Sequence, residues 1–463
     1  MQELTVATPH PDVEAMAGLW PMPRTLYQGT AAMRAAGKMY LPKEAAESEA
    51  AYEARLKRTV LFNAFGKTVN DMAGRVFAKE IGFDGNVPEQ IKTWCENIDL
   101  TGRHLNVFAS DVFKDAEQVG LAHILADSPI NAGAMTRAQQ GRPYLIHLRA
   151  EDVIGWTHIV TDDGLKLETL RFYETVEEAD GIHVLRVAQI RVLLPNAFQI
   201  WRQNEKKEWF LYLEGTRDLA DIPLSTVYLA RTGFMTAKPP LQDLADLNVT
   251  HWQSSSDQRN ILHVARVPIL FGAGFPEDVP LVIGSSSLTR ASDPNAKLTY
   301  VEHHGYGTGA GENDLTKLEF QMQAMGLQLL DPQPGQSATG EVRDDIKENS
   351  RLAMWADALK DGLENALMWM TQIGGLGTNG GSLIVNKDFG IQARGSADVQ
   401  AILSAHQVGL LQKETVIREF IRRGILSDDI DPEAELEAAA DDALAAIETA
   451  QAGMQDASPP MAE

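Results

Sequence analysis

The sequence predicts an α+β protein, in which helices and an antiparallel sheet occupy separate parts of the chain. Three observations carry this prediction. Apolar residues recur at helical spacing from Ser48 to Lys79 and from Leu105 to Ala126. Between Tyr144 and Tyr228 they alternate or form short runs separated by turn residues, as in a meander of strands. Beyond Pro239-Pro240 long helical patterns return.

Size and composition bound the class of protein. At 463 residues, 44% of them hydrophobic, the chain is long enough for two or three cores. No run approaches the roughly 20 apolar residues that a membrane span needs. The first residues lack the basic and apolar regions of a signal peptide. Cys95 is the only cysteine, so we expect no intrachain disulfide, no cysteine metal cluster and a reducing, cytoplasmic setting.

The formal net charge of −23 argues against a protein that binds phosphate groups over much of its surface. Two interpretations remain open. An acidic wall lets DNA pass without adhering, and an acidic surface can also serve solubility alone.

The N-terminal half begins with an irregular segment. Residues 1–49 hold scattered Pro and Gly and predict an extended arm with short helices, with a disordered tail as the alternative. Ser48 is a possible N-cap for the helix that follows. The second helix, Leu105–Ala126, passes through Phe108, Val112, Val119 and Ile124. Strands are then predicted at Leu145–Leu148, Leu165–Phe172, His183–Leu194, Phe198–Trp201 and Trp209–Leu213.

The stretch from Pro240 to Gly374 predicts a helix, a β insertion, a second helix, a polar loop and one long helix. The first helix, Leu241–Arg266, has a polar middle from His251 to Asn260, which is typical of a helix that crosses solvent between two packed regions. The insertion carries β-type runs at Val267–Phe271, Pro280–Ile283 and Leu298–Val301.

The second helix is predicted to begin near Asp314, a possible N-cap. Its apolar residues repeat at a/d spacing, a seam for another helix: Leu315, Leu318, Met322, Met325 and Leu329. Two prolines and two glycines make Asp331–Gly340 a loop. The long helix, Glu341–Met370, carries an apolar stripe of Val342, Ile346, Leu359, Leu363, Leu367 and Met370.

The C-terminal part is short and increasingly acidic. Ser382–Val385 is a predicted strand, Ser396 can cap a helix, and Lys413–Arg423 is a further helix. Residues 427–463 contain eleven Asp or Glu and no Lys or Arg. We expect the alanine-rich part of this segment to be helical in part and its last residues to be disordered.

Three patterns invite an enzymatic or metal-binding interpretation, and context argues against each. Gly375–Gly380 matches the dinucleotide fingerprint but follows a helix and precedes a strand, so a helix-to-strand turn explains its glycines. Gly305–Gly311 lacks the lysine of a P-loop and predicts a flexible linker. Adjacent His303 and His304 on a strand point to opposite faces. We therefore predict no catalytic residue, no metal and no cofactor.

The order of elements from Pro240 to Gly374 resembles the stem, clip, stem, tunnel loop and wing helix of tailed-bacteriophage portal proteins, the head-to-tail connectors. The closing runs also resemble portals: Gln407-Val-Gly-Leu-Leu-Gln-Lys-Glu-Thr415, Phe420-Ile-Arg-Arg-Gly-Ile-Leu426 and Asp431-Pro-Glu-Ala-Glu-Leu-Glu437. Other runs are similar to a less-studied portal-like group: Tyr40-Leu-Pro-Lys43, Arg58-Thr-Val-Leu-Phe-Asn63, Asp152-Val-Ile-Gly-Trp156 and Asp246-Leu-Asn-Val-Thr-His-Trp252.

The resemblance implies a portal-like division of the chain. It comprises an N-terminal arm (1–49), a mixed helical and β wing domain (50–239), a first stem helix (240–266), a β-rich clip insertion (267–311) and a second stem helix (312–330). There follow a tunnel loop (331–340), a long wing helix with a strand (341–395), a C-terminal helical crown (396–451) and a disordered acidic tail (452–463).

The resemblance also implies a function. A portal is a homo-oligomeric ring of about twelve subunits at one capsid vertex. Double-stranded DNA passes through it without sequence specificity during packaging and ejection. The implied partners are the terminase large subunit, a head–tail adaptor, and the major capsid and scaffold proteins, with no membrane. The implied location is the virion, and the host cytoplasm during assembly. Such a protein is not an enzyme.

Two sets of site residues follow from the resemblance. The expected tunnel-loop residues are neutral or acidic groups that can pass a phosphate backbone without binding it: Asp331, Gln333, Gln336, Ser337 and Thr339. An outer surface loop is the alternative. The expected clip contacts for terminase or an adaptor are Glu277, Asp278, Arg290 and Lys297.

Apolar helical faces around Leu56, Val112 and Leu363 exceed what one compact domain should need, so we expect part of them to serve subunit contacts. Two rival classes remain open. One is a soluble α+β hydrolase with an unrecognised site, and the other is a capsid-vertex adaptor without a motor-facing channel.

Overall fold

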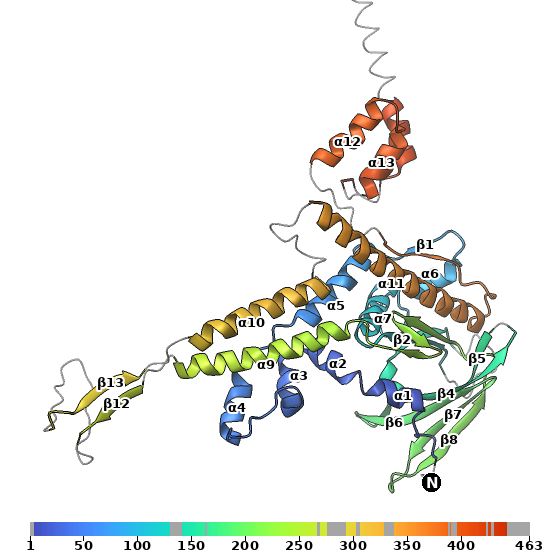
Figure 1. Cartoon of the computed structure of the whole chain (residues 1–463). Helices are drawn as coiled ribbons and strands as arrows, with labels where there is room; N and C mark the ends of the chain where they lie inside the picture. The colour runs from blue at the N-terminus through green and yellow to red at the C-terminus, as the bar shows by residue number, and fades with distance from the viewer. Residues whose placement is uncertain are drawn as a thin grey trace, which may run out of the picture.

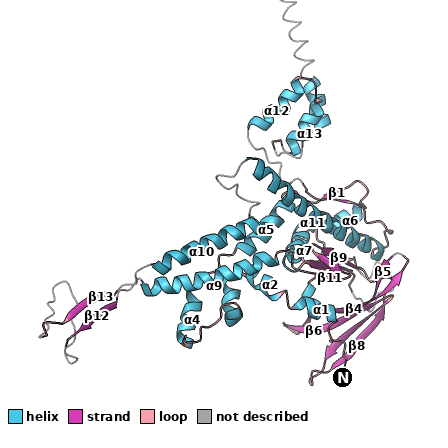
Figure 2. Ribbon diagram, in the orientation of Figure 1, coloured by secondary structure: helices cyan, strands magenta, loops and turns pink. Residues whose placement is uncertain are grey.

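The structure is a computed structural model that describes residues 4–129, 141–162, 164–265, 269–275, 293–301, 306–327, 338–387, 389, 396–422, 425–426 and 430–441. Helices and antiparallel strands form a broad body, and one pair of long helices extends from it (Figure 1; Figure 2). The predicted α+β class is confirmed.

The N-terminal segment consists of short helices: α1 (Pro11–Ala17), α2 (Pro21–Gln28), α3 (Thr30–Ala36) and a 3-10 turn (Gly37–Met39). Trp20, Leu26 and Met33 are buried, and His10 stacks on Trp156 at 4.5 Å between ring centroids. The short helices were predicted correctly. The expectations of an extended arm or a disordered tail are wrong for residues 4–49, because apolar side chains anchor this segment to the body.

The helical pattern from Ser48 to Lys79 is two helices, α4 (Glu49–Arg58) and α5 (Ala64–Val76). Ser48 caps α4 as predicted, accepting a hydrogen bond from the Ala51 N–H at 3.2 Å. Asn63 starts α5 by accepting one from the Gly66 N–H at 2.9 Å. Val60, which lies within the predicted helical stretch, is exposed in the break between the helices.

After β1 (Gly82–Phe83) and α6 (Glu89–Cys95), helix α7 (Leu105–Val119) ends at Gly120, whose φ of 98° is left-handed. A Cβ on Gly120 would overlap the carbonyl oxygen of Lys238. Residues Leu121–Asp127 form strand β2, so the predicted continuation of the helix to Ala126 is wrong. Every residue of β2 is buried, including His123 and Asp127, so its sequence lacks the alternation of apolar and polar residues that marks a half-buried strand.

Strand β2 is the centre of an antiparallel sheet with the order β3-β2-β9, where β3 is Tyr144–Leu148 and β9 is Leu224–Tyr228. A second sheet follows after the 3-10 turn Ala150–Asp152. It contains β4 (Val153–Thr161), β5 (Gly164–Asp180), β6 (His183–Leu194), β7 (Ala197–Gln203) and β8 (Trp209–Thr216), antiparallel and in chain order. The predicted meander is confirmed. Strands β10 (Arg231–Gly233) and β11 (Thr236–Ala237) form a small hairpin.

The second half is dominated by α9 (Gln242–Ala265), α10 (Tyr306–Met322) and α11 (Ala338–Ile373), with the hairpin β12 (Ile269–Ala273) and β13 (Lys297–Val301) between the first two helices. Helix α10 begins at Tyr306, so the predicted linker at residues 305–311 and the predicted start near Asp314 are wrong. Each glycine in a helix costs about 1 kcal/mol relative to alanine, which packing on α9 can offset.

The C-terminal elements are β14 (Leu383–Ile384), α12 (Ser396–Gln407), α13 (Lys413–Arg422) and a helical segment at residues 432–441. The chain passes from α11 to β14 through Gly375, Gly377 and Gly381, whose φ values are 71°, 119° and 82°. Strand β14 pairs with β1. The interpretation of these glycines as a helix-to-strand turn is confirmed.

The principal core joins α5, α7, β2, α9 and α11. The apolar stripe of α11 is fully buried at Leu359, Leu363, Leu367 and Met370, as predicted. Helix α11 lies close to β9 at Gly362, where a Cβ would overlap the side chain of Val227.

Two of the faces expected to serve subunit contacts belong to this core. Val112 and Leu363 are fully buried within the single chain, and Leu56 packs against the core. That expectation is therefore wrong for these faces, and any contact between subunits needs other surfaces.

Glu117 generates a prediction about stability. It is fully buried in α7, and both carboxylate oxygens lack a hydrogen-bond partner among the described residues. Burial raises its pKa well above the usual value, while Lys114 acts in the opposite direction. Because the pKa of Glu117 is higher in the folded than in the unfolded protein, the stability linked to its protonation is fully present below the unfolded pKa, about 4.3. This stability is lost as the pH rises from that value toward the folded pKa.

We therefore expect Glu117→Gln to raise the free energy of unfolding by about 1–3 kcal/mol at pH 8. The difference from wild type should shrink toward pH 4. Urea denaturation at several pH values measures both. Glu53→Gln, on the exposed side of α4, is the control and should follow the wild type. A Glu117→Gln protein with the wild-type pH profile would contradict the prediction.

Candidate functional site

Helices α9 and α10 run side by side away from the body, with β12 and β13 at their far end (Figure 1). Leu318 and Met322 of α10 are buried, as the a/d spacing predicts. Met325 is 48% exposed, so the predicted seam ends before it. The paired helices are the feature that sets this part of the chain apart from the body.

The polar middle of α9 does not cross open solvent. His251, Ser255, Ser256 and Gln258 are all buried, and that prediction is wrong. His251 Nε2 lies 3.2 Å from Oε1 of Glu319, and the Ser254 hydroxyl donates to Asp314 at 3.2 Å. One side of the polar stretch thus packs on α10.

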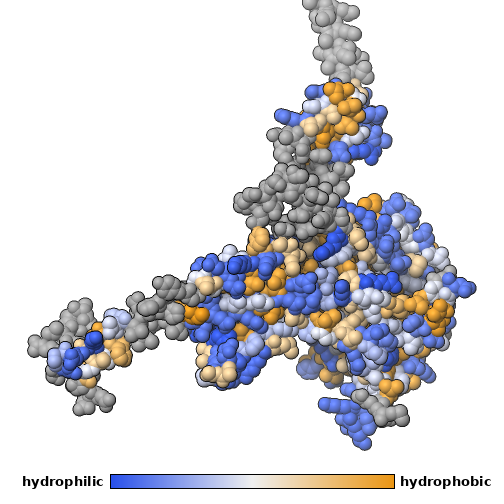
Figure 3. Space-filling model, viewed as in Figure 1, coloured by the Kyte–Doolittle hydropathy of each residue, from blue (hydrophilic) through white to orange (hydrophobic). Residues whose placement is uncertain are grey.

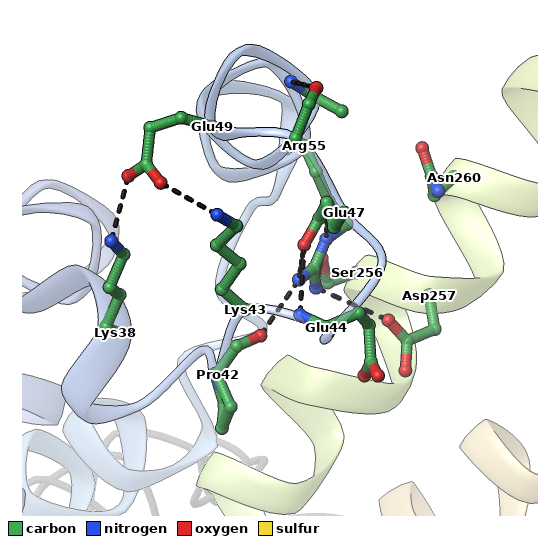
Figure 4. Close-up of polar contacts among 12 residues, drawn as sticks. Lys38, Pro42, Lys43, Glu44, Glu47, Glu49, Arg55, Ser256, Asp257 and Asn260 are labelled. Atoms are coloured by element: carbon green, nitrogen blue, oxygen red, sulfur yellow. Dashed lines mark hydrogen bonds and ion pairs between the residues drawn. The ribbon is translucent and has the colours of Figure 1, made fainter.

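The other side of α9 contacts α4 through Arg55, whose side chain is 4% exposed. Its Nε and Nη2 donate to the two carboxylate oxygens of Glu47, each at 2.8 Å, and Nη2 also donates to the carbonyl of Pro42 at 2.9 Å (Figure 4). Its Nη1 lies 3.4 Å from Ser256 and from Asp257 on α9. The hydrogen bonds between Arg55 and Glu47 raise the pKa of Arg55 and lower the pKa of Glu47, while burial opposes both shifts.

Two further contacts connect α4 with α9. The Thr59 hydroxyl lies 2.9 Å from that of Ser256, and Arg58 donates to Asn260 at 3.0 Å. At the surface, Lys38 and Lys43 both pair with Glu49, but exposed ion pairs contribute little. The buried Arg55 cluster is therefore the main electrostatic connection between the two helices.

The β12–β13 hairpin exposes apolar side chains on both faces. Phe271, opposite Thr299, is 56% exposed. Tyr300 is 58% exposed, and Leu298 is exposed beside it. Strand residues alternate between faces, so Phe271 lies opposite to Leu298 and Tyr300. An isolated two-stranded hairpin is marginally stable in water, and this one therefore offers a surface that a partner can cover.

At the other end of the helical pair, α10 passes into a π-helical turn, Gln323–Leu327. A Cβ on Gly326 would lie 2.7 Å from Leu244 and 2.9 Å from Thr68, so this turn is held tightly against α9 and α5. Beside it is a cavity of about 370 Å³ between the start of α9, the π turn and α11. The Arg351 guanidinium lies 5.8 Å from the Trp355 ring centroid at this cavity.

The structure does not bring the predicted site residues together. Lys297 is the first residue of β13, opposite Ala273, and is exposed. Glu277, Asp278 and Arg290 lie outside the described residues, as do Asp331, Gln333, Gln336 and Ser337. Thr339 lies in the first turn of α11, so its assignment to a loop is wrong, and Ala338–Gly340 is helical.

Sequence reasoning missed the Arg55 cluster and the close approach of Gly311 to Gln258. The available signals were an arginine beside Tyr52 on the apolar side of α4 and three consecutive serines, 254–256, in α9. Small side chains let another element approach closely, and an arginine among apolar residues requires buried acceptors. Neither signal identifies its partner without the fold.

In the described part of the chain, no group of three or more His, Cys, Asp or Glu is placed to hold a metal ion. Among the same residues, no helix combines the length and the apolar character that a membrane span requires.

Comparison with known proteins gives a family match and similarities to solved structures. Residues 240–373 match a family model described as a domain of unknown function, DUF4055, which covers α9 to α11. This is less than half of the chain, and it coincides with the stretch whose order of elements resembles portal proteins. No curated protein matches the chain.

Two of the similar solved structures are a chain from the neck of an empty gene transfer agent particle, computed with C6 symmetry, and a chain from the virion of a native gene transfer agent particle. Both are 10% identical, with a TM-score of 0.42. They cover 78% and 77% of this chain, and 89% of each of those chains is covered. At this level of similarity they carry no argument about function.

The Arg55 cluster generates a prediction. Removing one partner of a buried ion pair typically costs about 3–5 kcal/mol. We expect Arg55→Met to lower the free energy of unfolding by about that amount and to speed amide exchange in α4. Arg58→Met removes a single contact with Asn260 and should cost less than about 1 kcal/mol. Equal losses in the two variants, measured by urea denaturation, would show that the cluster does not hold α4 to α9.

Proposed function

We propose that this chain is a structural subunit of a phage-like virion, the portal protein at the vertex where head and tail join. One observation carries the proposal. A helical pair bears a β-hairpin at its far end and is followed by the 36-residue helix α11 across the body. The sequence resemblance between residues 40 and 437 supports it, and the proposed protein is not an enzyme.

In this proposal α9 and α10 are the stem, the segment with β12 and β13 is the clip, and residues 331–337 belong to the tunnel loop. The elements up to β11, with α11, are the wing, and α12 and α13 belong to the crown. Because α10 begins at Tyr306, the clip ends before that residue rather than at Gly311.

A ring needs apolar surface that the single chain leaves exposed. The α12–α13 unit offers such a surface, since Val408 is 72% and Leu410 78% exposed, and Leu403 is exposed beside them. Figure 3 shows hydrophobic residues on the visible side of this unit. These residues are our candidates for contacts between neighbouring copies.

The proposed ring encloses a channel for double-stranded DNA during packaging and ejection. The formal charge of −23 per chain suits a wall that phosphate groups pass without binding. The β-hairpin is the proposed docking site for the terminase large subunit and then for a head–tail adaptor, with Lys297 exposed on it. Capsid and scaffold proteins would contact the ring at the vertex, with assembly in the host cytoplasm.

The test is the oligomeric state. We expect purified protein to form closed rings of about twelve subunits, visible by electron microscopy and by mass measurement. The double variant Val408→Asp with Leu410→Asp should shift the mass toward smaller species, because it places charges in the proposed contact. Gln407→Asp with Gln412→Asp adds the same charge nearby without removing apolar surface and is the control.

A monodisperse monomer at micromolar concentration, with capsid and scaffold proteins present, would contradict the portal proposal. It would leave the hydrolase interpretation standing. An open or vertex-bound assembly without a central hole would instead favour an adaptor.

A second test concerns the proposed tunnel loop. Gln333→Lys with Gln336→Lys would add two cations per subunit, or many phosphate contacts in a ring. If the loop lines the channel, packaging should slow in a salt-dependent way while ring formation stays normal. Gln407→Lys with Gln412→Lys, outside the loop, is the charge-matched control. Packaging at the wild-type rate in low salt would place the loop outside the channel.

A further inference from the structure

We propose that the first turns of α10, residues 306–311, form a joint that opens when a partner docks on the β12–β13 hairpin. This inference rests on the proposed function for the identity of the partner, but the joint itself is a property of the single chain. The joint lies between the hairpin, which Figure 1 shows at the far end of the helical pair, and the part of α10 that packs on α9.

The composition of this segment weakens the helix. Gly307, Gly309 and Gly311 are three of the first six residues of α10. Glycine has the greatest backbone freedom to lose in a helix, and it is among the poorest residues in helix interiors. Three such residues in one and a half turns lower the cost of opening this segment without affecting the rest of the helix.

Close packing accounts for only one of the two glycines whose surroundings are described. A Cβ on Gly311 would overlap Oε1 of Gln258, so a larger residue there would require this buried side chain to move. Around Gly309 no described atom lies within 4 Å of the position that a Cβ would occupy. Alanine would fit at 309 and would favour the helix, so backbone freedom is the property that glycine supplies at this position.

Apart from the close approach of Gln258 to Gly311, the last residue of the joint, the contacts that fix α10 begin beyond residue 311. Asp314 accepts from Ser254, Glu319 lies against His251, and Leu318 and Met322 are buried. On the neighbouring helix, Ile261 and His263 in the last turns of α9 are exposed. The described last turns of α9 are thus partly exposed, while the middle of the helical pair is fixed. Opening at residues 306–311 would change the direction of the hairpin and leave the packed helices in place.

The chain offers a matched pair of substitutions for the test. Gly309→Ala adds a methyl group in open space and stabilises the helix at the joint. Gly74→Ala, in α5, also adds a methyl group with no described atom within 4 Å, and it serves as the control far from the hairpin. The measurement is hydrogen exchange of the full-length protein, followed by mass spectrometry of peptides covering residues 306–311 and 314–322.

In the wild type we expect faster exchange at 306–311 than at 314–322. Gly309→Ala should slow exchange at the joint roughly fivefold, the factor that corresponds to the difference in helix propensity between glycine and alanine. Gly74→Ala should leave the joint unchanged. The joint would be overturned if the peptides 306–311 and 314–322 of the wild type exchanged at equal rates. It would also be overturned if Gly309→Ala did not slow exchange at residues 306–311.

The functional part is tested by binding to the purified terminase large subunit. If docking uses the opened joint, reducing its population fivefold should weaken the apparent affinity by up to about fivefold. The control should bind as the wild type does. If Gly309→Ala slows exchange at the joint but binds the terminase large subunit with wild-type affinity, the joint has no role in docking.

Loss of the ring in Gly309→Ala would mean that Gly309 is a close contact between copies, which also overturns the joint. If the wild type forms no ring and binds no terminase, the proposed function fails, and the exchange measurement still decides the joint independently.

Discussion

The burial of one face of α11 is the constraint on which the arrangement of the molecule depends. Leu359, Leu363 and Leu367 are fully buried in the core that α7, β2 and α9 share. The backbone of α11 comes close to β9 at Gly362, where the Ser225 hydroxyl donates to the Gly362 carbonyl at 2.6 Å. Because the start of α9 and the end of α10 belong to the same core, the direction of the helical pair is set where these elements meet.

Polar contacts hold α9 of the helical pair in place, whereas apolar packing holds the body together. Ser255 and Ser256 are small enough for α4 to approach α9, and Arg55 fills the contact with hydrogen bonds to Glu47 and Pro42. Replacing water by such partners stabilises a buried charge only when its donors are satisfied. The arrangement accounts for a helix whose middle is both polar and buried, a combination that a single sequence does not reveal.

The parts of the fold that the sequence predicted share one property: their pattern is local. The strands from β4 to β8 alternate and are joined by short turns, and the apolar stripe of α11 repeats along one helix. The failures depend on distant residues. Strand β2 is buried on both sides, so its residues do not alternate between apolar and polar, and only Gly120 marks the change from helix to strand. The start of α10 was missed because glycine is a poor helix former, and the approach of Gln258 to Gly311 is a contact between distant residues.

In the candidate site, too, local features were predictable and contacts between distant residues were not. The position of Lys297 on a strand next to a helix was predictable from its neighbours, whereas the burial of His251 against Glu319 was not, since 68 residues separate them.

The length of α9 has a mechanical consequence. Its 24 residues span roughly 36 Å at the rise of an α-helix. Treated as a rigid lever pivoting at the π turn and the cavity beside Trp355, it would convert a rotation of about 10° into a displacement of about 6 Å at its far end. A change of side-chain packing at the pivot, too small to alter the core, would thus be amplified into a movement comparable with the spacing of neighbouring strands.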